Sequence, residues 1–153
     1  MIKKIDLKTY TKPTDFARLL EGENKIILIS EGGMVRKHGM KTARGYIPLG
    51  DCSETPDCEW CQKGNEAKLK WIWVAYISGQ VKVLDVGPMI GDGICRELQR
   101  HGLDRFTNAI FNIKRIGTGR ETRYEIKYVG QNQEKLNVES AKNFLVKKYF
   151  QSQ

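Results

Sequence analysis

The sequence predicts a mainly β fold, a five-stranded β-barrel that carries helices. Two segments are predicted to form β-hairpins, because apolar and β-branched residues flank the glycine-containing turns 78–80 and 117–119. A third apolar run, Lys25–Ser30, predicts a buried strand that precedes both hairpins. A chain of 153 residues is long enough to bury a core, so residues 1–153 are expected to form one domain.

The N-terminal third holds a helix, a strand and an insertion. Residues 13–22 predict a short helix, with proline near its start and glycine at its end. The strand Lys25–Ser30 follows, and Gly32 and Gly33 end or kink it. Residues 34–64 are rich in turn residues, and they predict an insertion whose order depends on a bound metal.

The middle of the chain predicts a hairpin and then a helix. Trp71–Ile77 and Val81–Val86 form the two strands of the first hairpin. A helix is expected from about Gly91 to His101, closed by Gly102.

The C-terminal part predicts a second hairpin and a last helix. The hairpin strands are expected at 109–116 and 122–129. The last helix is expected at 137–150, with Asn137 as its cap. Its apolar face would consist of Ala141, Phe144, Leu145 and Tyr149.

This order of elements is that of an OB-fold with an insertion between strands 1 and 2 and an added C-terminal helix. OB-folds are five-stranded barrels that bind oligonucleotides on an open face. SH3-like barrels and unrelated α+β sheets share the order and stay open as alternatives.

Three of the four cysteines lie within ten residues and predict a zinc site. Cys58 and Cys61 form a Cys-x-x-Cys, which lets two thiolates point inward from one turn, and Cys52 precedes them. A tetrahedral site needs a fourth ligand, and thirteen residues separate His38 from the first cysteine. We therefore expect His38, Cys52, Cys58 and Cys61 to hold a structural Zn²⁺.

Disulfides and plain buried thiols are the alternatives to a metal. The N-terminal residues lack the apolar stretch of a signal peptide, which favours a reducing cytoplasm, where clustered cysteines are more often metal ligands. Cys95 stands apart, on a helical stripe with Ile94 and Leu98, and is expected to be a small core residue.

A catalytic metal is not favoured. Four protein ligands leave no open coordination position, whereas a catalytic zinc keeps one. Nucleobase deaminases pair their cysteines with His-x-Glu, but Gly39 and Met40 follow His38. We expect no catalytic residues and no enzymatic activity from this cluster.

The chain is basic, which suits a polyanionic partner such as nucleic acid. Lys and Arg number 26 against 18 Asp and Glu, a formal net charge of +8. No apolar run approaches the roughly 18 residues of a membrane helix, so no membrane partner is expected.

Candidate nucleic-acid contacts lie on the strands and beside the cysteines. Trp71 and Trp73 share one face of their strand, and if that face is open they could stack on bases. The alternative is that both pack under the final helix. Trp60 lies within the cysteine cluster, where it is either exposed beside Lys63 or caps the metal site. Some of the candidate cations would contact only solvent. The candidate cations are Arg36, Lys37, Arg44, Lys114, Arg115, Arg120 and Arg123.

One stretch carries a resemblance to a known family. Residues 113–124, IKRIGTGRETRY, resemble a recurring Ile-Lys-Arg-x-Gly-x-Gly-x-x-Thr-x-Tyr pattern of zinc-containing single-stranded DNA-binding proteins of tailed phages. The His…Cys…Cys-x-x-Cys insertion and the tryptophan-rich strand add to this likeness, which covers most of residues 25–130. The T-even helix-destabilising protein belongs to the same kind, and its ligand types and order match His38, Cys52, Cys58 and Cys61, although the cysteine intervals differ.

The resemblance implies an OB-fold that coats single strands during replication, recombination or repair, in the host cytoplasm if the chain is phage-encoded. Many such proteins end in an acidic tail that recruits replication or recombination proteins, whereas this chain ends in Lys147–Gln153. Replication and recombination proteins are the partners that the resemblance implies, but residues 147–153 lack the acidic character through which the family recruits them.

The expected function is sequence-tolerant binding of single-stranded DNA, with RNA open as a ligand because it also presents phosphates and stackable bases. The competing expectation is a zinc-stabilised adaptor for a protein such as a polymerase, a nuclease or a host defence complex.

Overall fold

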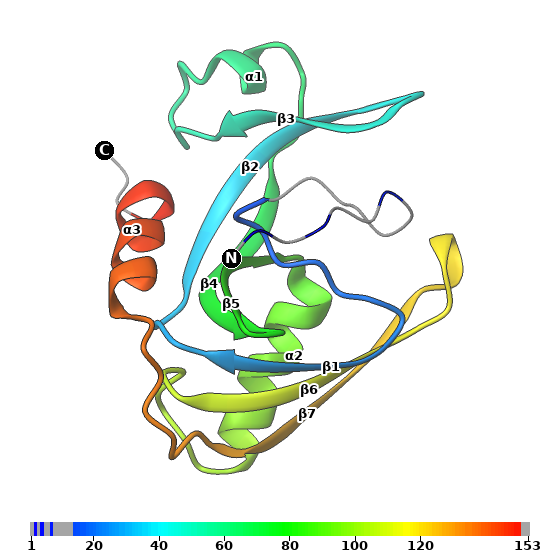
Figure 1. Cartoon of the computed structure of the whole chain (residues 1–153). Helices are drawn as coiled ribbons and strands as arrows, with labels where there is room; N and C mark the ends of the chain where they lie inside the picture. Colours follow the sequence, from blue (N-terminus) through cyan, green and yellow to red (C-terminus); the bar gives the residue numbers. More distant parts are fainter. Residues whose placement is uncertain (1, 3, 5–6, 8–13, 151–153) are drawn as a thin grey trace.

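The computed structural model describes residues 2, 4, 7 and 14–150, which form a β-rich molecule with helices on both sides of one sheet (Figure 1). The strands are β1 (Gly22–Leu28), β2 (Gly33–Thr42), β3 (Gly45–Asp51), β4 (Lys68–Ile77), β5 (Gln80–Val86), β6 (Ala109–Ile116) and β7 (Arg123–Gln131). The helices are α1 (Glu59–Gln62), α2 (Pro88–Arg100) and α3 (Glu139–Tyr149), and a 3₁₀ turn, η1 (Gly119–Glu121), lies at the tip of β6–β7.

The mainly β prediction is confirmed, but the sheet has seven strands rather than five and does not close into a barrel. Its order is β3-β2-β4-β1-β6-β7, with β5 paired to β4, and every pair of strands is antiparallel. The two additional strands are β2 and β3, a hairpin within residues expected to be mostly turns. Most side chains of β3 are exposed, so its sequence lacks the alternation of buried and exposed residues that identifies a strand.

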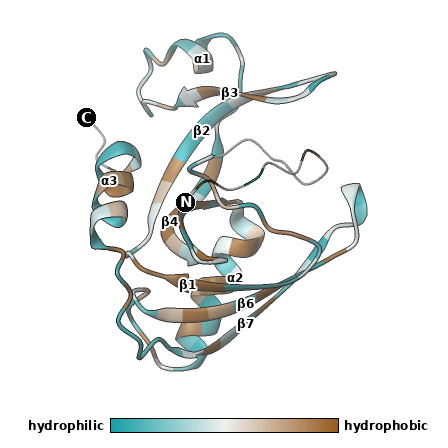
Figure 2. Ribbon diagram, viewed as in Figure 1, coloured by the Kyte–Doolittle hydropathy of each residue, from teal (hydrophilic) through white to brown (hydrophobic). Residues whose placement is uncertain are grey.

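The sheet buries a hydrophobic core on each face. The larger core lies under α2 and includes Trp73, Phe111 and Ile94. The smaller core includes Val74 and Val83, and Leu145 of α3 covers it. Figure 2 shows apolar residues along the sheet and on the sides of α2 and α3 that face it. Strand β4 is therefore covered on both faces.

The two predicted hairpins and the helix between them are confirmed. In the β4–β5 turn, Ser78 and Gly79 have φ values of 51° and 76°, as a two-residue type I′ turn requires, and Ile77 pairs with Gln80. Helix α2 begins three residues earlier than expected, at Pro88. No helix in the described part of the chain is long and apolar enough to cross a membrane.

The predicted helix at 13–22 is wrong for residues 14–21, none of which is helical. The backbone there runs beside β5 instead: the N–H of Ala17 donates to the Val83 carbonyl, and the N–H of Val83 donates to the Asp15 carbonyl, both at 2.7 Å. The extended path places Phe16 against the smaller core. Pro13 lies outside the described residues.

The last helix is confirmed with two corrections. Val138 precedes it instead of Asn137, and no side chain caps its first turn. Of the predicted apolar face, Leu145 is buried, whereas Phe144 is 60% exposed and Ala141 is exposed. Tyr149 of the predicted face packs with Leu145 against the smaller core, and Val146 packs there although it was not predicted to do so.

Candidate metal centre

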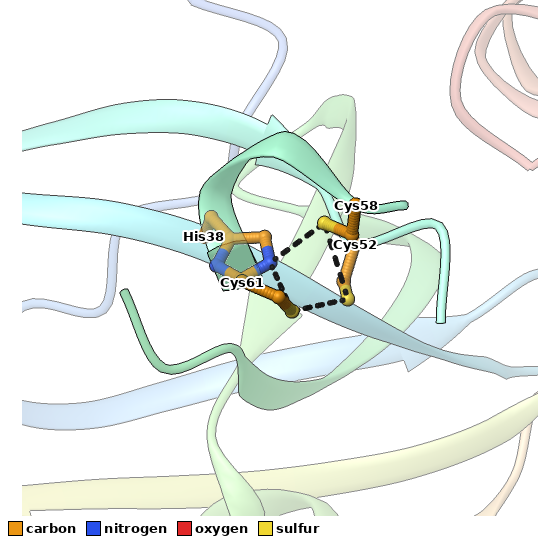
Figure 3. A group of neighbouring side chains, drawn as sticks. All are labelled: His38, Cys52, Cys58 and Cys61. Atoms are coloured by element: carbon orange, nitrogen blue, oxygen red, sulfur yellow. Dashed lines mark hydrogen bonds between the residues drawn. The ribbon is translucent and has the colours of Figure 1, made fainter. Parts of the chain in front are cut away.

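His38, Cys52, Cys58 and Cys61 lie together, with their ligand atoms within 4.8 Å of one another. His38 lies in β2, and Cys52 directly follows β3, held by a bond from its N–H to the Arg36 carbonyl (2.7 Å). The other two cysteines come from the turn at Cys58 and the short helix α1 that contains Cys61. Figure 3 shows the four side chains pointing toward one another from these elements.

The distances between the ligand atoms are those of a tetrahedral metal site. The Cys52 sulfur lies 3.8 Å from that of Cys58 and 3.6 Å from that of Cys61. The His38 Nε2 lies 3.4 Å from the Cys58 sulfur and 3.5 Å from the Cys61 sulfur. A tetrahedron with metal–sulfur bonds of about 2.3 Å and a metal–nitrogen bond of about 2.0–2.1 Å has edges of roughly 3.8 Å and 3.6 Å. The cluster can therefore hold a metal ion such as zinc.

The structure has no disulfide bond between any of the four cysteines. All four cysteines of the chain are free. Sulfur separations of 3.6–3.8 Å in the cluster far exceed the roughly 2.05 Å of a disulfide bond. Cys95 is not part of the cluster: it is half-buried on α2, and burial raises the pKa of its thiol.

Asn65 orients the histidine, and sequence reasoning missed it. The Nδ1–H of His38 donates to Asn65 Oδ1 at 2.7 Å, and Asn65 Nδ2 donates to the Gly39 carbonyl at 2.8 Å. This bond fixes the ring with Nε2 free to face the thiols, the usual role of a group behind a metal-bound histidine. The only signal in the sequence is the position of Asn65, four residues after Cys61.

The thiols of Cys58 and Cys61 do not both ionise at neutral pH without a cation. Hydrogen bonds from the backbone at Cys61 and Ser53 lower the pKa of the Cys58 thiol to about 5. Hydrogen bonds with the Cys52 and Cys58 side chains raise the pKa of Cys61 to about 12, because a second negative charge in the cluster is unfavourable. A bound cation removes this repulsion, so the donor set suits a metal ion.

Of the alternatives for Trp73, the open face is wrong, because the side chain is fully buried. Trp71 is half-buried and stacks on Trp73, with ring centroids 5.9 Å apart. Both pack toward α2 rather than under the final helix, and a Cβ at Gly91 would collide with the Trp71 ring. Trp73 cannot stack on a base in this structure.

The cationic side chains lie mainly on two hairpins. Arg44 is exposed near the β2–β3 tip, while Arg36 pairs with Glu54 (3.3 Å) and Lys37 with Asp85 (2.8 Å). On β6–β7, Arg115 donates to the Leu19 carbonyl at 3.0 Å. The exposed predicted cations there are Lys114, Arg120 and Arg123.

Trp60 lies in α1 beside the metal ligands and is half-buried. The Lys63 ammonium lies 4.8 Å from the centre of its ring, a cation–π contact. Trp60 therefore lies beside Lys63, as one of the two alternatives expected, and is neither fully exposed nor fully buried.

Comparisons of the chain with protein-family models, with curated proteins and with solved structures found no match.

Proposed function

We propose that this protein binds single-stranded DNA without sequence preference and acts, without enzymatic activity, in DNA replication, recombination or repair. The distribution of charge is the observation that carries the proposal. The β2–β3 hairpin, residues 33–51, has four basic residues against one acidic, and the β6–β7 hairpin, residues 109–131, has five against two. Six of the eight excess positive charges therefore belong to two hairpins.

The arrangement of these hairpins supports a shared ligand. Both tips reach the right-hand side of the molecule in Figure 1. A polyanionic strand that passes along this side would meet cations from both, and phosphate neutralisation dominates the affinity of non-specific nucleic-acid binding.

We infer that the metal is a structural zinc ion. Three sulfurs and one imidazole nitrogen form a set that zinc favours, and four protein ligands leave no position for a reacting water. His38, Cys52, Cys58 and Cys61 would hold the ion, and Asn65 would orient the histidine through its hydrogen bond to Nδ1. In this proposal residues 34–64 are a zinc-ordered insertion into an OB-fold-like sheet.

The salt dependence of binding tests the proposal. If about 3–5 phosphates are neutralised, log K for fluorescently labelled oligo-dT falls against log salt with a slope of about −2 to −3.5. Fluorescence anisotropy is the suitable readout, because the buried Trp73 leaves tryptophan quenching a poor reporter. Oligo-U measured in parallel tests whether RNA is also bound.

Matched charge variants identify the surface. Arg44→Gln and Arg120→Gln each remove an exposed hairpin charge and should each reduce the slope by about 0.7. Lys135→Gln removes an equal charge from an exposed residue outside both hairpins and should leave the slope unchanged. Absence of oligo-dT binding at low salt, or equal losses in all three variants, would contradict the proposed surface.

The competing candidate, a zinc-stabilised adaptor, is favoured by one observation. The segment 51–59 beside the metal ligands carries four acidic residues and no basic ones, in an otherwise basic chain. The four acidic residues, all of them exposed, are Asp51, Glu54, Asp57 and Glu59. A protein that binds there should stay associated after nuclease treatment, whereas a partner held through DNA should be lost.

A further inference from the structure

A cleft of about 510 Å³ separates the β2–β3 hairpin from the body of the protein. Its lining is apolar to a greater degree than that of the other cavities found among the described residues. Its volume lies within the roughly 300–1,000 Å³ of small-ligand sites. The side chains that matter are Tyr46 and Pro48 from β3, Phe16 and Tyr149 opposite, and Lys37 and Lys70.

Tyr46 forms the wall that belongs to the metal-bound hairpin. Its side chain is 56% exposed, and its ring lies so close to Gly39 that any Cβ there would collide with it. Gly39 directly follows the ligand His38, and the carbonyl of Gly39 accepts a bond from Asn65. The position of Tyr46 is thus tied to the metal centre.

The opposite wall joins two segments that are far apart in the sequence. The rings of Phe16 and Tyr149 meet edge to face, with centroids 5.1 Å apart. The Tyr149 hydroxyl donates to Asp15 at 2.7 Å, and Lys148 pairs with the same carboxylate at 2.9 Å. Helix α3 therefore helps to build the cleft as well as covering the smaller core.

The charges of the cleft suit a neutral aromatic group better than a phosphate. Asp85 pairs with Lys37 at 2.8 Å and with Lys70 at 3.5 Å, and Asp51 also lines the cleft. Two lysines against two aspartates leave the lining formally neutral. The exposed cations Lys41 and Arg44 lie further along the same hairpin, where they can meet phosphates.

We propose that this cleft takes one unstacked nucleobase of a single strand, with Tyr46 on the metal-held wall and Phe16 and Tyr149 on the wall completed by the C-terminal helix. The inference rests on the proposed function. Every base has a π-face, so a site of this kind adds affinity without imposing a sequence. The phosphates on either side of the base would lie against the basic hairpin.

The test compares a base-bearing strand with a strand that lacks bases. Oligo-dT and an abasic oligonucleotide of equal length present the same phosphates. Tyr46→Leu should weaken oligo-dT binding about tenfold, a loss within the range measured for one stacked base, and should leave abasic binding unchanged. Tyr46→Phe, which keeps the ring, should bind oligo-dT like the unmodified chain.

Two further variants keep the result interpretable. Phe16→Leu changes the opposite wall and should also weaken oligo-dT binding selectively, independently of any disturbance near the metal. Phe144→Leu alters an aromatic side chain of α3 that is 60% exposed and does not line the cleft, and it should have no effect. Metal content of one ion per chain confirms that the metal-held wall is folded in each variant, and the denaturant midpoint confirms that the body carrying Phe16 is folded.

Three outcomes would overturn the inference. If the unmodified chain binds the abasic strand as tightly as oligo-dT, no base enters a binding site. If it discriminates between them but Tyr46→Leu and Phe16→Leu behave like Phe144→Leu, the base binds elsewhere and the proposed function survives. If the unmodified chain binds neither strand at low salt, the proposed function itself fails.

Discussion

Removal of the metal ion is expected to disorder residues 34–64 while the rest of the sheet stays folded. Between positions 34 and 64, Cys58 is the only buried residue of hydrophobic type and His38 the only buried polar one, and both are metal ligands. This region has no hydrophobic core of its own. Metal binding in zinc-finger peptides contributes about 10–16 kcal/mol of apparent free energy at neutral pH. The other main attachments of the region are the pairing of Gly33–Lys37 with β4 and the packing of Val35 on the smaller core, and both involve only the start of β2.

Hydrogen exchange of the metal-loaded and chelator-treated protein measures this effect. Protection of the β2–β3 amides against exchange should fall by several orders of magnitude on chelation. The amides of residues 72–77 in β4, which pairs with β1 and β5, should stay protected. Cys58→Ser should reproduce the chelated state and bind less than one ion per chain. Cys95→Ser is the matched control, because Cys95 is not part of the cluster.

A chelated protein that kept the protection of residues 34–64 would contradict a structural role for the metal. Retention of one ion per chain by Cys58→Ser would contradict the ligand set. The same chelation should weaken oligo-dT binding if the β2–β3 hairpin forms part of the DNA surface, since Arg44 and Lys41 would no longer be held in place.

The metal ligands could be predicted from the sequence because their spacing is a local property. Cys58 and Cys61 are brought together by a single turn, and cysteine has few other uses at that spacing. Asn65 could not be predicted, because an asparagine after a loop has many ordinary roles. Its function depends on how β2 and the segment after α1 are placed relative to each other.

The error over the tryptophans has a physical cause. Alternation along β4 separates Ile72 and Val74 from Trp71 and Trp73 correctly, but alternation alone does not reveal whether either face is open. Here α2 covers one face and α3 the other. A strand buried on both faces reads as a nearly continuous apolar run, and the run from Trp71 to Ile77 contains no charged residue.

The N-terminal segment shows the limit of helix-end signals. Proline and glycine were correctly placed for a helix at 13–22, yet the described part of this segment is extended because Phe16 packs between β5 and Tyr149. Tertiary packing of one aromatic side chain outweighs local propensity over so short a segment.

Replacement of Trp73 by alanine is expected to lower the free energy of unfolding by about 3–5 kcal/mol, the usual cost of removing a large buried aromatic side chain. The side chain is fully buried and contacts Trp71 and Phe106, with ring centroids 5.9 Å and 5.4 Å apart. Denaturant unfolding of the metal-loaded protein measures the loss. Met89→Ala, on the exposed side of α2, is the control and should have little effect.

Trp73→Phe separates this structural role from a role in DNA binding. The smaller ring keeps most of the apolar packing and removes an indole N–H that has no hydrogen-bond partner among the described residues, so part of the packing loss is offset. Because the ring of Trp73 does not reach solvent, the folded Trp73→Phe protein should bind oligo-dT with unchanged affinity and unchanged salt slope. Weaker oligo-dT binding by Trp73→Phe, without loss of stability or of metal, would mean that β4 opens to present the indole when the strand binds. The cleft at Tyr46 would then not be the only place where this protein contacts a base.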